Sequence, residues 1–386
     1  MRVLVAFDKF KDSLTAAEAC DVAAHVISGR DPGWQVDRCP LSDGGEGFSP
    51  ILTRQAGGEC RQVPVCGPLG GPVQAPLGLV PLRQVPEAAR QRMGLSADSG
   101  SVAVIDMASA SGLALVPPDR RDLLSTSTRG TGELIAAAHR AGARAIVLGV
   151  GGSATHDLGL GALEALGVRF LGDTGARIMA LTPSKWHSLA AIEGGTDPGL
   201  PEICIACDVD NPVLGPRGAL SVYGPQKGLR PQDAAALERQ TARVAALVCR
   251  HFGKPETLRD QPGAGAAGGI AFGLLAAAPA RIVSGFDLVS AWLDLDARIA
   301  AADLVITGEG RFDDSSLSGK GPGSVTARAL KLGKPVQVFA GALALTRPVA
   351  GLRAHAISPE GLELAQALAQ AGERLAASLR QFIAFP

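Results

Sequence analysis

The chain has 386 residues, 37 basic and 37 acidic side chains and 49 glycines, but only 11 Phe, 3 Trp and 1 Tyr. This length predicts two or three domains with substantial cores, and the 46% hydrophobic content without net charge argues against disorder. Balanced charge and few aromatic rings also argue against a basic nucleic-acid-binding protein. The excess of glycine is the unusual feature.

The chain carries no pattern of a secreted or membrane protein. Its first apolar run, residues 3–7, is too short for the core of a signal peptide. Two long uncharged stretches, 62–82 and 263–280, contain several Gly and Pro residues and are poor candidates for spanning helices. Among seven cysteines only Cys204 and Cys207 have metal or redox spacing, so we interpret all seven as buried thiols of a cytoplasmic protein.

Short apolar runs alternate with helical patterns along the chain. This alternation predicts an α/β architecture of two domains with mainly parallel sheets. The expected strands are residues 2–7, 35–39, 102–106, 145–149, 203–207, 304–307, 336–340 and 354–357. The expected helices are residues 14–26, with Ser13 as N-cap, 131–141, 233–250, 322–331 and 361–382.

One region breaks the alternation. Residues 60–82 place a Gly-Pro-Leu-Gly-Gly-Pro centre between Val-rich arms, which predicts a β-hairpin-like excursion, and residues 86–101 are expected to be an exposed polar loop. The chain is therefore expected to leave its first domain near residue 60. A return near residue 285 makes 1–60 with 285–386 a discontinuous Rossmann- or flavodoxin-like domain, and 61–284 an inserted α/β domain.

Many glycines directly follow expected strands, together with Ser, Thr, Asp, Glu or Lys. Ligands of α/β sheets bind at the carboxyl ends of strands, and Gly lets the backbone approach a ligand closely. Asp8 and Lys11 follow the first strand, and Asp43 and Glu46 lie in a Gly-rich run after the second. Each segment is either a ligand loop or an ordinary capped turn.

Three further segments carry polar groups at glycine-rich positions. Residues 149–157 match the G-x-G-x-x-A form of the dinucleotide fingerprint and offer amides and hydroxyls for phosphates, with His156 interpreted as a polar loop residue rather than a base. Asp208 and Asp210 offer oxygen ligands for Mg²⁺, and Lys227 offers charge for a phosphate, although Asx residues before Pro also form ordinary turns.

The remaining segments complete a set suited to phosphoryl transfer. Residues 125–132 are rich in hydroxyls, and residues 307–321 bring Glu309, Arg311 and Lys320 close in sequence. Residues 263–268 satisfy G-x-G-x-x-G without a preceding strand, which indicates close helix packing or a phosphate-facing helix start. Walker A, protein-kinase, H-E-x-x-H and G-x-S-x-G motifs are absent from the sequence. The residues alone therefore indicate a two-domain enzyme for a phosphorylated or anionic small molecule.

Taken in order, these segments resemble the bacterial type I glycerate kinase family. The matching segments are residues 6–14 (AFDKFKDSL), 43–47 (DGGEG), 127–134 (STRGTGEL), 149–155 (GVGGSAT), 206–212 (ACDVDNP), 224–228 (GPQKG), 262–269 (PGAGAAGG) and 308–313 (GEGRFD). The chain departs from the family pattern at Lys9, where Ser is common, and at Phe48, where Thr is common. His156-Asp157-Leu158-Gly159 also stands where Asn-Asp-Gly-Gly is common.

The resemblance implies a two-domain α/β fold with its active site in the cleft between the domains. It also implies transfer of the γ-phosphoryl group of ATP, with Mg²⁺, to D-glycerate, giving ADP and 2-phosphoglycerate, with 3-phosphoglycerate as the alternative product. The expected partners are therefore this small acid and a nucleotide, with no nucleic acid and no membrane. The sequence does not determine the oligomeric state.

Roles for individual residues follow from the same resemblance. We expect Lys11 or Arg311 at the substrate carboxylate, Asp8 or Asp43 at its hydroxyls, and Glu46 in the substrate site. The nucleotide is expected at Gly151, Gly152, Ser153, Thr155 and Glu309, and Mg²⁺ at Asp208 or Asp210. Asp43 or Asp208 is the expected base, and Lys227 or Lys320 the group that stabilises the transferring charge.

Two other functions remain open at this point. The first is a Rossmann-type NAD-dependent oxidoreductase of a small hydroxy acid, which would use residues 149–154 but leaves Asp208, Asp210 and Lys227 without a role. The second is a non-catalytic binding protein for small acids, which would bind its ligand without consuming ATP.

Overall fold

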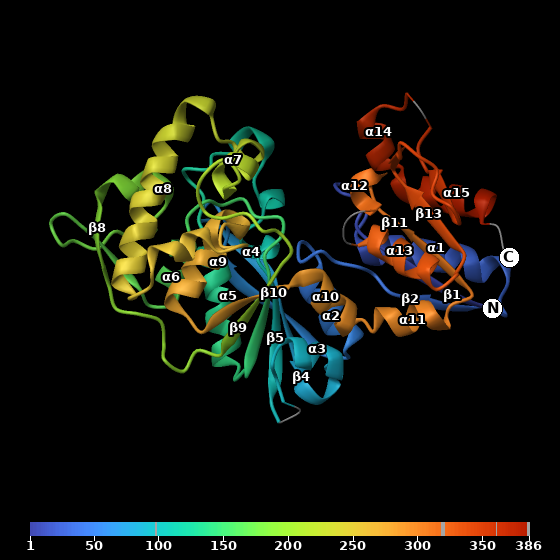
Figure 1. Cartoon of the computed structure of the whole chain (residues 1–386), viewed down its shortest axis with the longest axis horizontal. Helices are drawn as coiled ribbons and strands as arrows, with labels where there is room; N and C mark the ends of the chain where they lie inside the picture. Colours follow the sequence, from blue (N-terminus) through green and yellow to red (C-terminus); the bar gives the residue numbers. More distant parts are fainter. Residues whose placement is uncertain (97–98, 318–320, 360, 384–386) are drawn as a thin grey trace. The chain divides into compact units, whose positions relative to one another are not determined.

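The structure, a computed structural model, describes residues 1–96, 99–317, 321–359 and 361–383. The chain divides into two compact units. Unit 1 contains Met1–Asp43 and Val289–Pro386, and unit 2 contains Gly44–Leu288. In Figure 1 the blue first segment and the orange-to-red last segment accordingly belong to the same unit. Lys320 lies outside the described residues.

Unit 1 is built on a parallel sheet with the order β15-β13-β11-β1-β2. Its strands are β1 (Arg2–Phe7), β2 (Gln35–Arg38), β11 (Leu304–Gly308), β13 (Val336–Ala340) and β15 (Leu352–Ala356). When these described strands are numbered along the chain, their order is 2-1-3-4-5, the flavodoxin-like order. The chain direction across the sheet then reverses between β1 and β11, which is where ligands of open α/β sheets bind.

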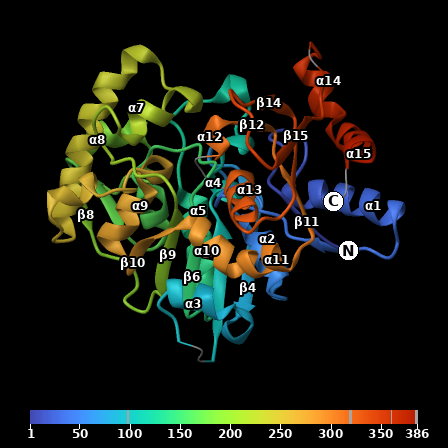
Figure 2. The same cartoon turned by 45° about the vertical axis from the view of Figure 1, so that its right-hand side comes forward.

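Helices connect these strands and cover the sheet. They are α1 (Ala16–Arg30), α11 (Leu295–Ala301), α12 (Asp314–Leu317), α13 (Pro322–Lys331), α14 (Leu364–Ala369) and α15 (Ala371–Phe382), and β12 (Arg311–Asp313) pairs with β14 (Ala342–Ala344). Helices α1 and α15, from opposite ends of the chain, pack side by side (Figures 1 and 2). The single helix predicted for 361–382 is wrong, because the backbone leaves helical geometry at Gln370.

The N-cap predicted for α1 is also wrong by two residues. Thr15 caps the helix, accepting a hydrogen bond from the Glu18 amide at 3.2 Å, while the Glu18 carboxylate accepts from the Thr15 amide at 2.8 Å. This reciprocal pair is a capping box. The Ser13 hydroxyl instead donates to the Phe10 carbonyl at 3.0 Å, in the turn before the helix. The Thr-x-x-Glu spacing is the sequence signal that identifies the correct cap.

Unit 2 is built on a mixed sheet with the order β10-β9-β6-β5-β4-β3. Strands β5, β6, β9 and β10 run parallel, whereas β4 is antiparallel to both β5 and β3, which confirms the predicted hairpin. The strands are β3 (Glu59–Cys66), β4 (Pro72–Pro81), β5 (Ser101–Asp106), β6 (Ala145–Gly149), β9 (Glu202–Cys207) and β10 (Ala280–Ser284), and β7 (Arg169–Gly172) pairs with β8 (Leu189–Glu193). The predicted α/β fold class with mainly parallel sheets is confirmed.

Of the helices of unit 2 in the described part of the chain, the sequence patterns predicted only those at residues 131–141 and 233–250. The helices of this unit are α2 (Phe48–Gln55), α3 (Glu87–Arg92), α4 (Ala108–Ser111), α5 (Arg129–Arg140), α6 (Leu160–Ala165), α7 (Ala219–Tyr223), α8 (Pro231–His251) and α9 (Ala266–Ala277). Helix α10 (Gly285–Trp292) crosses the boundary between the units. Helix α3 occupies part of 86–101, which was expected to be a loop. Its Ala89 is fully buried, so one small apolar side chain anchors an otherwise polar helix.

Residues 44–60 belong to unit 2 in this division, whereas the sequence placed the first boundary at residue 60. The packing of α2 on the sheet of unit 2 explains why these residues belong to that unit. The Ser49 hydroxyl donates to the Val104 carbonyl of β5 at 2.7 Å. On β4, Gly78 makes room for the helix, because a Cβ there would lie 1.8 Å from the Thr53 hydroxyl oxygen.

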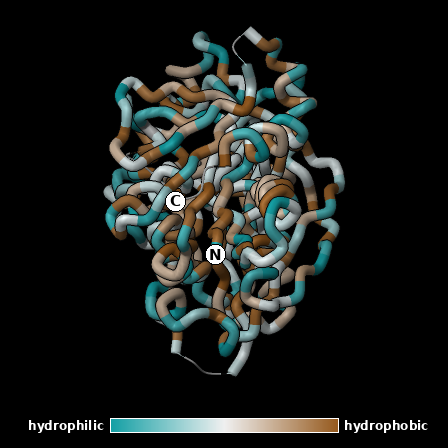
Figure 3. Tube along the Cα trace, turned by 90° about the vertical axis from the view of Figure 1, so that its right-hand side faces the viewer, coloured by the Kyte–Doolittle hydropathy of each residue, from teal (hydrophilic) through white to brown (hydrophobic). Residues whose placement is uncertain are grey.

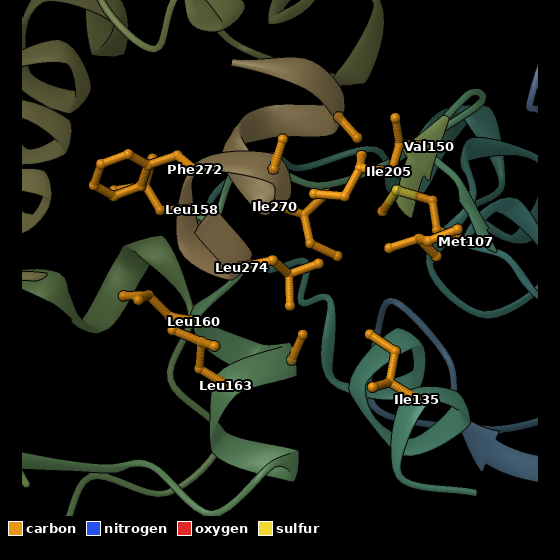
Figure 4. Close-up of a cluster of buried hydrophobic side chains, with 14 of the residues drawn as sticks. Met107, Ile135, Val150, Leu158, Leu160, Leu163, Ile205, Ile270, Phe272 and Leu274 are labelled. Carbon is orange, nitrogen blue, oxygen red and sulfur yellow. The ribbon is translucent and has the colours of Figure 1, made fainter. Parts of the chain in front are cut away.

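Each unit has its own buried core. The core of unit 1 lies between its sheet, α1 and α15, and includes Val5, Phe7, Ile27, Phe339 and Leu375. Figure 3 shows the apolar stretches of the chain as brown tube segments. The core of unit 2 includes the side chains drawn in Figure 4, in which α9 contributes Ile270, Phe272 and Leu274. None of the helices in the described part of the chain combines the length and apolarity that a bilayer-spanning helix requires.

The prediction that all seven cysteines are buried is wrong for two of them. Cys60 is exposed and Cys66 is half-buried. Both lie on β3, the edge strand of the sheet, which has a neighbouring strand on one side only. All seven cysteines are among the described residues and are thiols rather than disulfides.

Replacing Thr15 by Ala should lower the free energy of unfolding of unit 1 by about 1 kcal/mol, because the Glu18 amide loses its acceptor, whereas the backbone amide of residue 15 still donates to the Glu18 carboxylate. Urea unfolding followed by circular dichroism measures the change. Thr15→Ser is the matched control, because it keeps the accepting oxygen and should unfold like the wild type. Equal stability of Thr15→Ala and Thr15→Ser would contradict this assignment of the cap.

Candidate active site

Three acidic side chains of unit 1 meet at the carboxyl edge of its sheet. Asp8 directly follows β1, Glu309 directly follows β11, and Asp43 ends the segment that follows β2. Asp8 and Glu309 therefore lie on the two sides of the point at which the strand order reverses. Asp8 is only 9% exposed, Glu309 is half-buried, and Asp43 is exposed.

Burial and mutual repulsion change the acidity of this group. The pKa of Asp8 is raised from 3.8 to about 7, chiefly by burial and then by the negative charge of Asp43. The charge and amide of Lys9 oppose this rise, and the amide donates to the Asp8 carboxylate at 2.7 Å. Burial likewise raises the pKa of Glu309, with the charges of Asp313 and Asp43 adding to it. Asp8 therefore exchanges its proton near neutral pH, as a catalytic acid or base does.

The basic side chains of unit 1 are more exposed than these acids. The Lys9 ammonium lies 3.4 Å from the Asp43 carboxylate, so the residue that departs from the family pattern pairs with a predicted site residue. Lys11 is exposed, and the Arg311 guanidinium donates to Asp313 at 3.1 Å while its side chain remains 70% exposed. Both predicted carboxylate-binding residues therefore remain accessible to a small anion.

In unit 2 a glycine-rich loop, residues 149–157, leaves the end of β6. Its backbone is fixed by main-chain hydrogen bonds: Gly151 donates to the Gly44 carbonyl at 3.0 Å, and Ala154 donates to the Ser111 carbonyl at 2.9 Å. The amides of Gly152 and Ser153 donate to no acceptor in the described part of the chain. Two adjacent amides without a partner among the described residues are available to donate to an anion.

Lys227 lies beneath this loop. It ends η5 (Pro225–Lys227), is only 4% exposed, and its ammonium donates to the Ser153 hydroxyl at 2.7 Å and to the Thr155 carbonyl at 2.8 Å. Burial lowers the pKa of Lys227 to about 7, whereas the negative charge of Asp157 opposes that change. The lysine thus contacts the loop itself.

The end of the loop is held by buried polar groups. The Asp157 carboxylate accepts hydrogen bonds from the amide and hydroxyl of Thr128 and from the amides of Gly159 and Gly161. His156 lies within 3.1 Å of the Thr241 hydroxyl, and burial together with the charge of Lys227 lowers its pKa to about 3. A histidine that stays neutral across the physiological range supports the loop and is no base.

Helix α9 closes the loop from the other side. Its first turn is left-handed at Ala267, Gly268 and Gly269, with φ of 53°, 73° and 90°. A Cβ on Gly268 would lie 2.0 Å from the Thr155 carbonyl oxygen, so only glycine permits this approach. The second glycine motif is therefore used for close packing against the loop, which was one of its two predicted roles.

The carboxylates after β9 fit a nucleotide-bound Mg²⁺ better than an enclosed metal. Asp208 accepts from the Phe286 amide at 2.8 Å and the Ser284 hydroxyl at 3.3 Å, whereas Asp210 pairs with Arg217 at 2.6 Å. Within the described ranges no three His, Cys, Asp or Glu side chains are arranged to hold a metal ion. Mg²⁺ commonly takes one or two carboxylates and completes its shell with phosphate and water, and this donor set fits that arrangement.

The structure thus groups the predicted residues into local clusters. In unit 1 it brings together Asp8, Asp43 and Glu309, and in unit 2 it brings Lys227 to Ser153 and Thr155. Asp208 and Asp210 have partners of their own, Glu46 is exposed, and Lys320 lies outside the described residues.

Sequence reasoning missed one buried acid, Asp106, at the end of β5. Its carboxylate accepts from the amides of Ser49 and Ser109, and burial raises its pKa. Its position as the last residue of a buried strand was the available signal. Lys9, which was noted only as a departure from the family pattern, was likewise not predicted as a partner of Asp43.

Comparisons with known proteins give a consistent result. The model of the glycerate kinase family matches residues 3–385. The chain is 40% identical over 346 residues to a glycerate kinase of Bacillus subtilis, covering 89% of this chain and 85% of that protein. It is 38% identical over 346 residues to the glycerate 2-kinase of Escherichia coli, covering 89% and 86%. A crystal structure assigned to glycerate kinase 2 of Salmonella typhimurium matches with a TM-score of 0.75 at 37% identity, over 99% of this chain and 96% of that one.

The raised pKa of Asp8 predicts a pH-dependent stability. Because the folded pKa is about 7 and the ordinary value is 3.8, the folded protein holds a proton that the unfolded chain has lost between these pH values. The contribution is complete below pH 3.8 and is lost as the pH rises through 7. Between pH 5 and 6 the wild type should therefore lose about 1.4 kcal/mol of unfolding free energy relative to Asp8→Asn.

Urea unfolding of both proteins at the two pH values measures this difference. Asp21→Asn, at an exposed position on α1, is the control and should follow the wild type. A pH dependence that Asp8→Asn shares with the wild type would show that Asp8 is not the titrating group.

Proposed function

The chain belongs to the glycerate kinase family, and we propose that it transfers the γ-phosphoryl group of ATP to D-glycerate, giving ADP and 2-phosphoglycerate. The family match over residues 3–385 carries this proposal. The 2-position is favoured over 3-phosphoglycerate by the relative named glycerate 2-kinase, which is 38% identical to this chain.

In this proposal the nucleotide phosphates bind the loop of residues 149–157. The amides of Gly152 and Ser153 are oriented by the hydrogen bonds of their neighbours, so binding an anion requires little reorganisation of the backbone. Gly151 and Thr155 shape the same loop, although the Gly151 amide and the Thr155 carbonyl already have partners. Glu309 remains a predicted nucleotide contact in unit 1.

Asp208 and Asp210 would hold Mg²⁺ against the phosphates. The ion supplies positive charge that offsets the charge developing on the transferring group. The Phe286 amide and the Ser284 hydroxyl orient the Asp208 carboxylate, and Arg217 holds Asp210.

Asp8 is the residue that we assign to accept the proton of the attacking hydroxyl, in place of Asp43 or Asp208. It is buried at the point where the strand order reverses, and its pKa of about 7 suits proton transfer at neutral pH. Burial is the main cause of that pKa, and repulsion by Asp43 and Glu309 adds to it. Lys11 and Arg311, both exposed, are the proposed partners of the substrate carboxylate, and Glu46 remains a proposed substrate contact.

The geometry of the loop argues against the oxidoreductase alternative. The dinucleotide fingerprint requires a helix that begins at the glycine-rich turn, so that its N-terminus meets the pyrophosphate. Here the chain after Ala154 continues as an irregular segment, and α6 begins only at Leu160. The match of residues 149–154 to that fingerprint therefore lacks its structural context.

A phosphorus NMR experiment tests the proposed reaction. Incubation with ATP, Mg²⁺ and D-glycerate should produce a phosphomonoester signal, and its proton coupling assigns the 2- or 3-position. Omission of glycerate is the control for ATP hydrolysis. ATP left unchanged by folded protein would contradict the proposal, and binding of glycerate without its phosphorylation would favour the non-catalytic alternative.

Asp8→Asn should lower kcat by about 100-fold or more, because the hydroxyl proton loses its acceptor. The KM for ATP should change little. Steady-state assays with Asp21→Asn as a matched control measure this, and Asp43→Asn should also lower turnover because it removes a charge that tunes Asp8. Near-normal turnover of folded Asp8→Asn would exclude Asp8 as the base.

A further inference from the structure

We propose that Lys227 is a positioning residue whose proton sets the direction of the Ser153 hydroxyl, and thereby the affinity of the 149–157 loop for nucleotide phosphate. This inference rests on the proposed function only in taking the bound anion to be a nucleotide phosphate. This role takes the place of the direct stabilisation of transferred charge that the sequence suggested for Lys227, because the side chain is 4% exposed and its ammonium already donates to the Ser153 hydroxyl and the Thr155 carbonyl.

The mechanism follows from the hydrogen-bond donors and acceptors that the side chains of Lys227 and Ser153 carry. A protonated lysine has three donors and no acceptor, so at 2.7 Å the Ser153 oxygen accepts from the ammonium. The single proton of the Ser153 hydroxyl then points away from Lys227. We take it to point to the anion-binding side of the loop, which the amides of Gly152 and Ser153 define. Protonated Lys227 thus adds a hydroxyl donor to two amide donors.

Loss of the lysine proton reverses this arrangement. A neutral amine has a lone pair, which accepts the proton of the Ser153 hydroxyl, and its two remaining N–H bonds still serve the Thr155 carbonyl at 2.8 Å. The hydroxyl then turns inward and presents its lone pairs to the phosphate. One donor is lost and a repulsive contact takes its place, while the backbone of the loop is unchanged.

The residues around Lys227 determine the pH range in which its ammonium group loses a proton. Burial brings its pKa to about 7, and Asp157 acts in the opposite direction. Of the other groups near it, His156 is neutral above its pKa of about 3. Arg121, whose backbone packs against Gly228, keeps its charge at every pH of interest. Burial also raises the pKa of Asp157, against the hydrogen bonds from Thr128, Gly159 and Gly161 that lower it. Lys227 is the basic group of this cluster whose pKa, about 7, lies between pH 6.5 and 8.5.

Calorimetric titration with ADP in the presence of Mg²⁺, at pH 6.5 and pH 8.5, tests the inference. The wild type should bind roughly tenfold more weakly at the higher pH, the factor that loss of one charge-assisted hydrogen bond gives. Ser153→Ala should bind weakly at pH 6.5 and lack this additional pH dependence. The titration of ADP itself is common to both proteins and cancels in their comparison.

Two lysine variants complete the design. Lys227→Met has no proton to lose at this position and should bind ADP with the same affinity at pH 6.5 and pH 8.5, whereas Lys254→Met, at an exposed lysine of unit 2, should keep the pH dependence of the wild type. If Lys227→Met does not fold, Ser153→Ala alone decides. Equal pH dependence in the wild type and Ser153→Ala would overturn the inference.

The two possible failures are distinguishable. Absence of ADP binding to the folded wild type at either pH would contradict the proposed function together with the inference. Phosphorylation of glycerate accompanied by unaltered binding in Ser153→Ala would contradict the inference alone.

Discussion

Parallel pairing of strands determines where the chemistry of this protein is placed. Successive strands of a parallel sheet end at the same edge, so the segments that follow them are brought together there whatever their separation in the chain. In unit 1 this constraint gathers Asp8, Asp43 and Glu309, which are separated by up to 301 residues, at one edge. In unit 2 it aligns Asp106, the loop after Gly149, and Asp208 at the ends of β5, β6 and β9.

The two units differ in the environment that they provide for buried polar groups. In unit 1, burial raises the pKa values of Asp8 and Glu309, and repulsion by neighbouring carboxylates raises them further. Unit 2 surrounds its buried groups with partners, as when four N–H and O–H donors reach Asp157. The first arrangement gives a carboxyl at the sheet edge a pKa of about 7. The second holds the 149–157 loop in place through hydrogen bonds.

In unit 2, glycine residues allow the loops around these buried polar groups to pack closely. A Cβ on Gly151 would lie 2.8 Å from the backbone of Gly45, so the nucleotide loop and the loop that follows Asp43 are packed backbone to backbone. The excess of glycine in the composition therefore reflects contacts between loops as well as ligand approach. Leu158, in a left-handed conformation with φ of 54° where the family commonly has Gly, is held there by burial in the core (Figure 4).

The sequence by itself determined the family, the fold class and most strands, because periodicity, turn residues and motif order are local properties. It also proposed the segments of the candidate site. Only the tertiary structure decided that Lys227 lies buried against Ser153, that His156 is neutral, that Asp106 is enclosed, and that Asp8 is the most perturbed acid of its cluster. Burial, charge proximity and the partner of a side chain depend on residues that are distant in the chain, and these set the role of each residue.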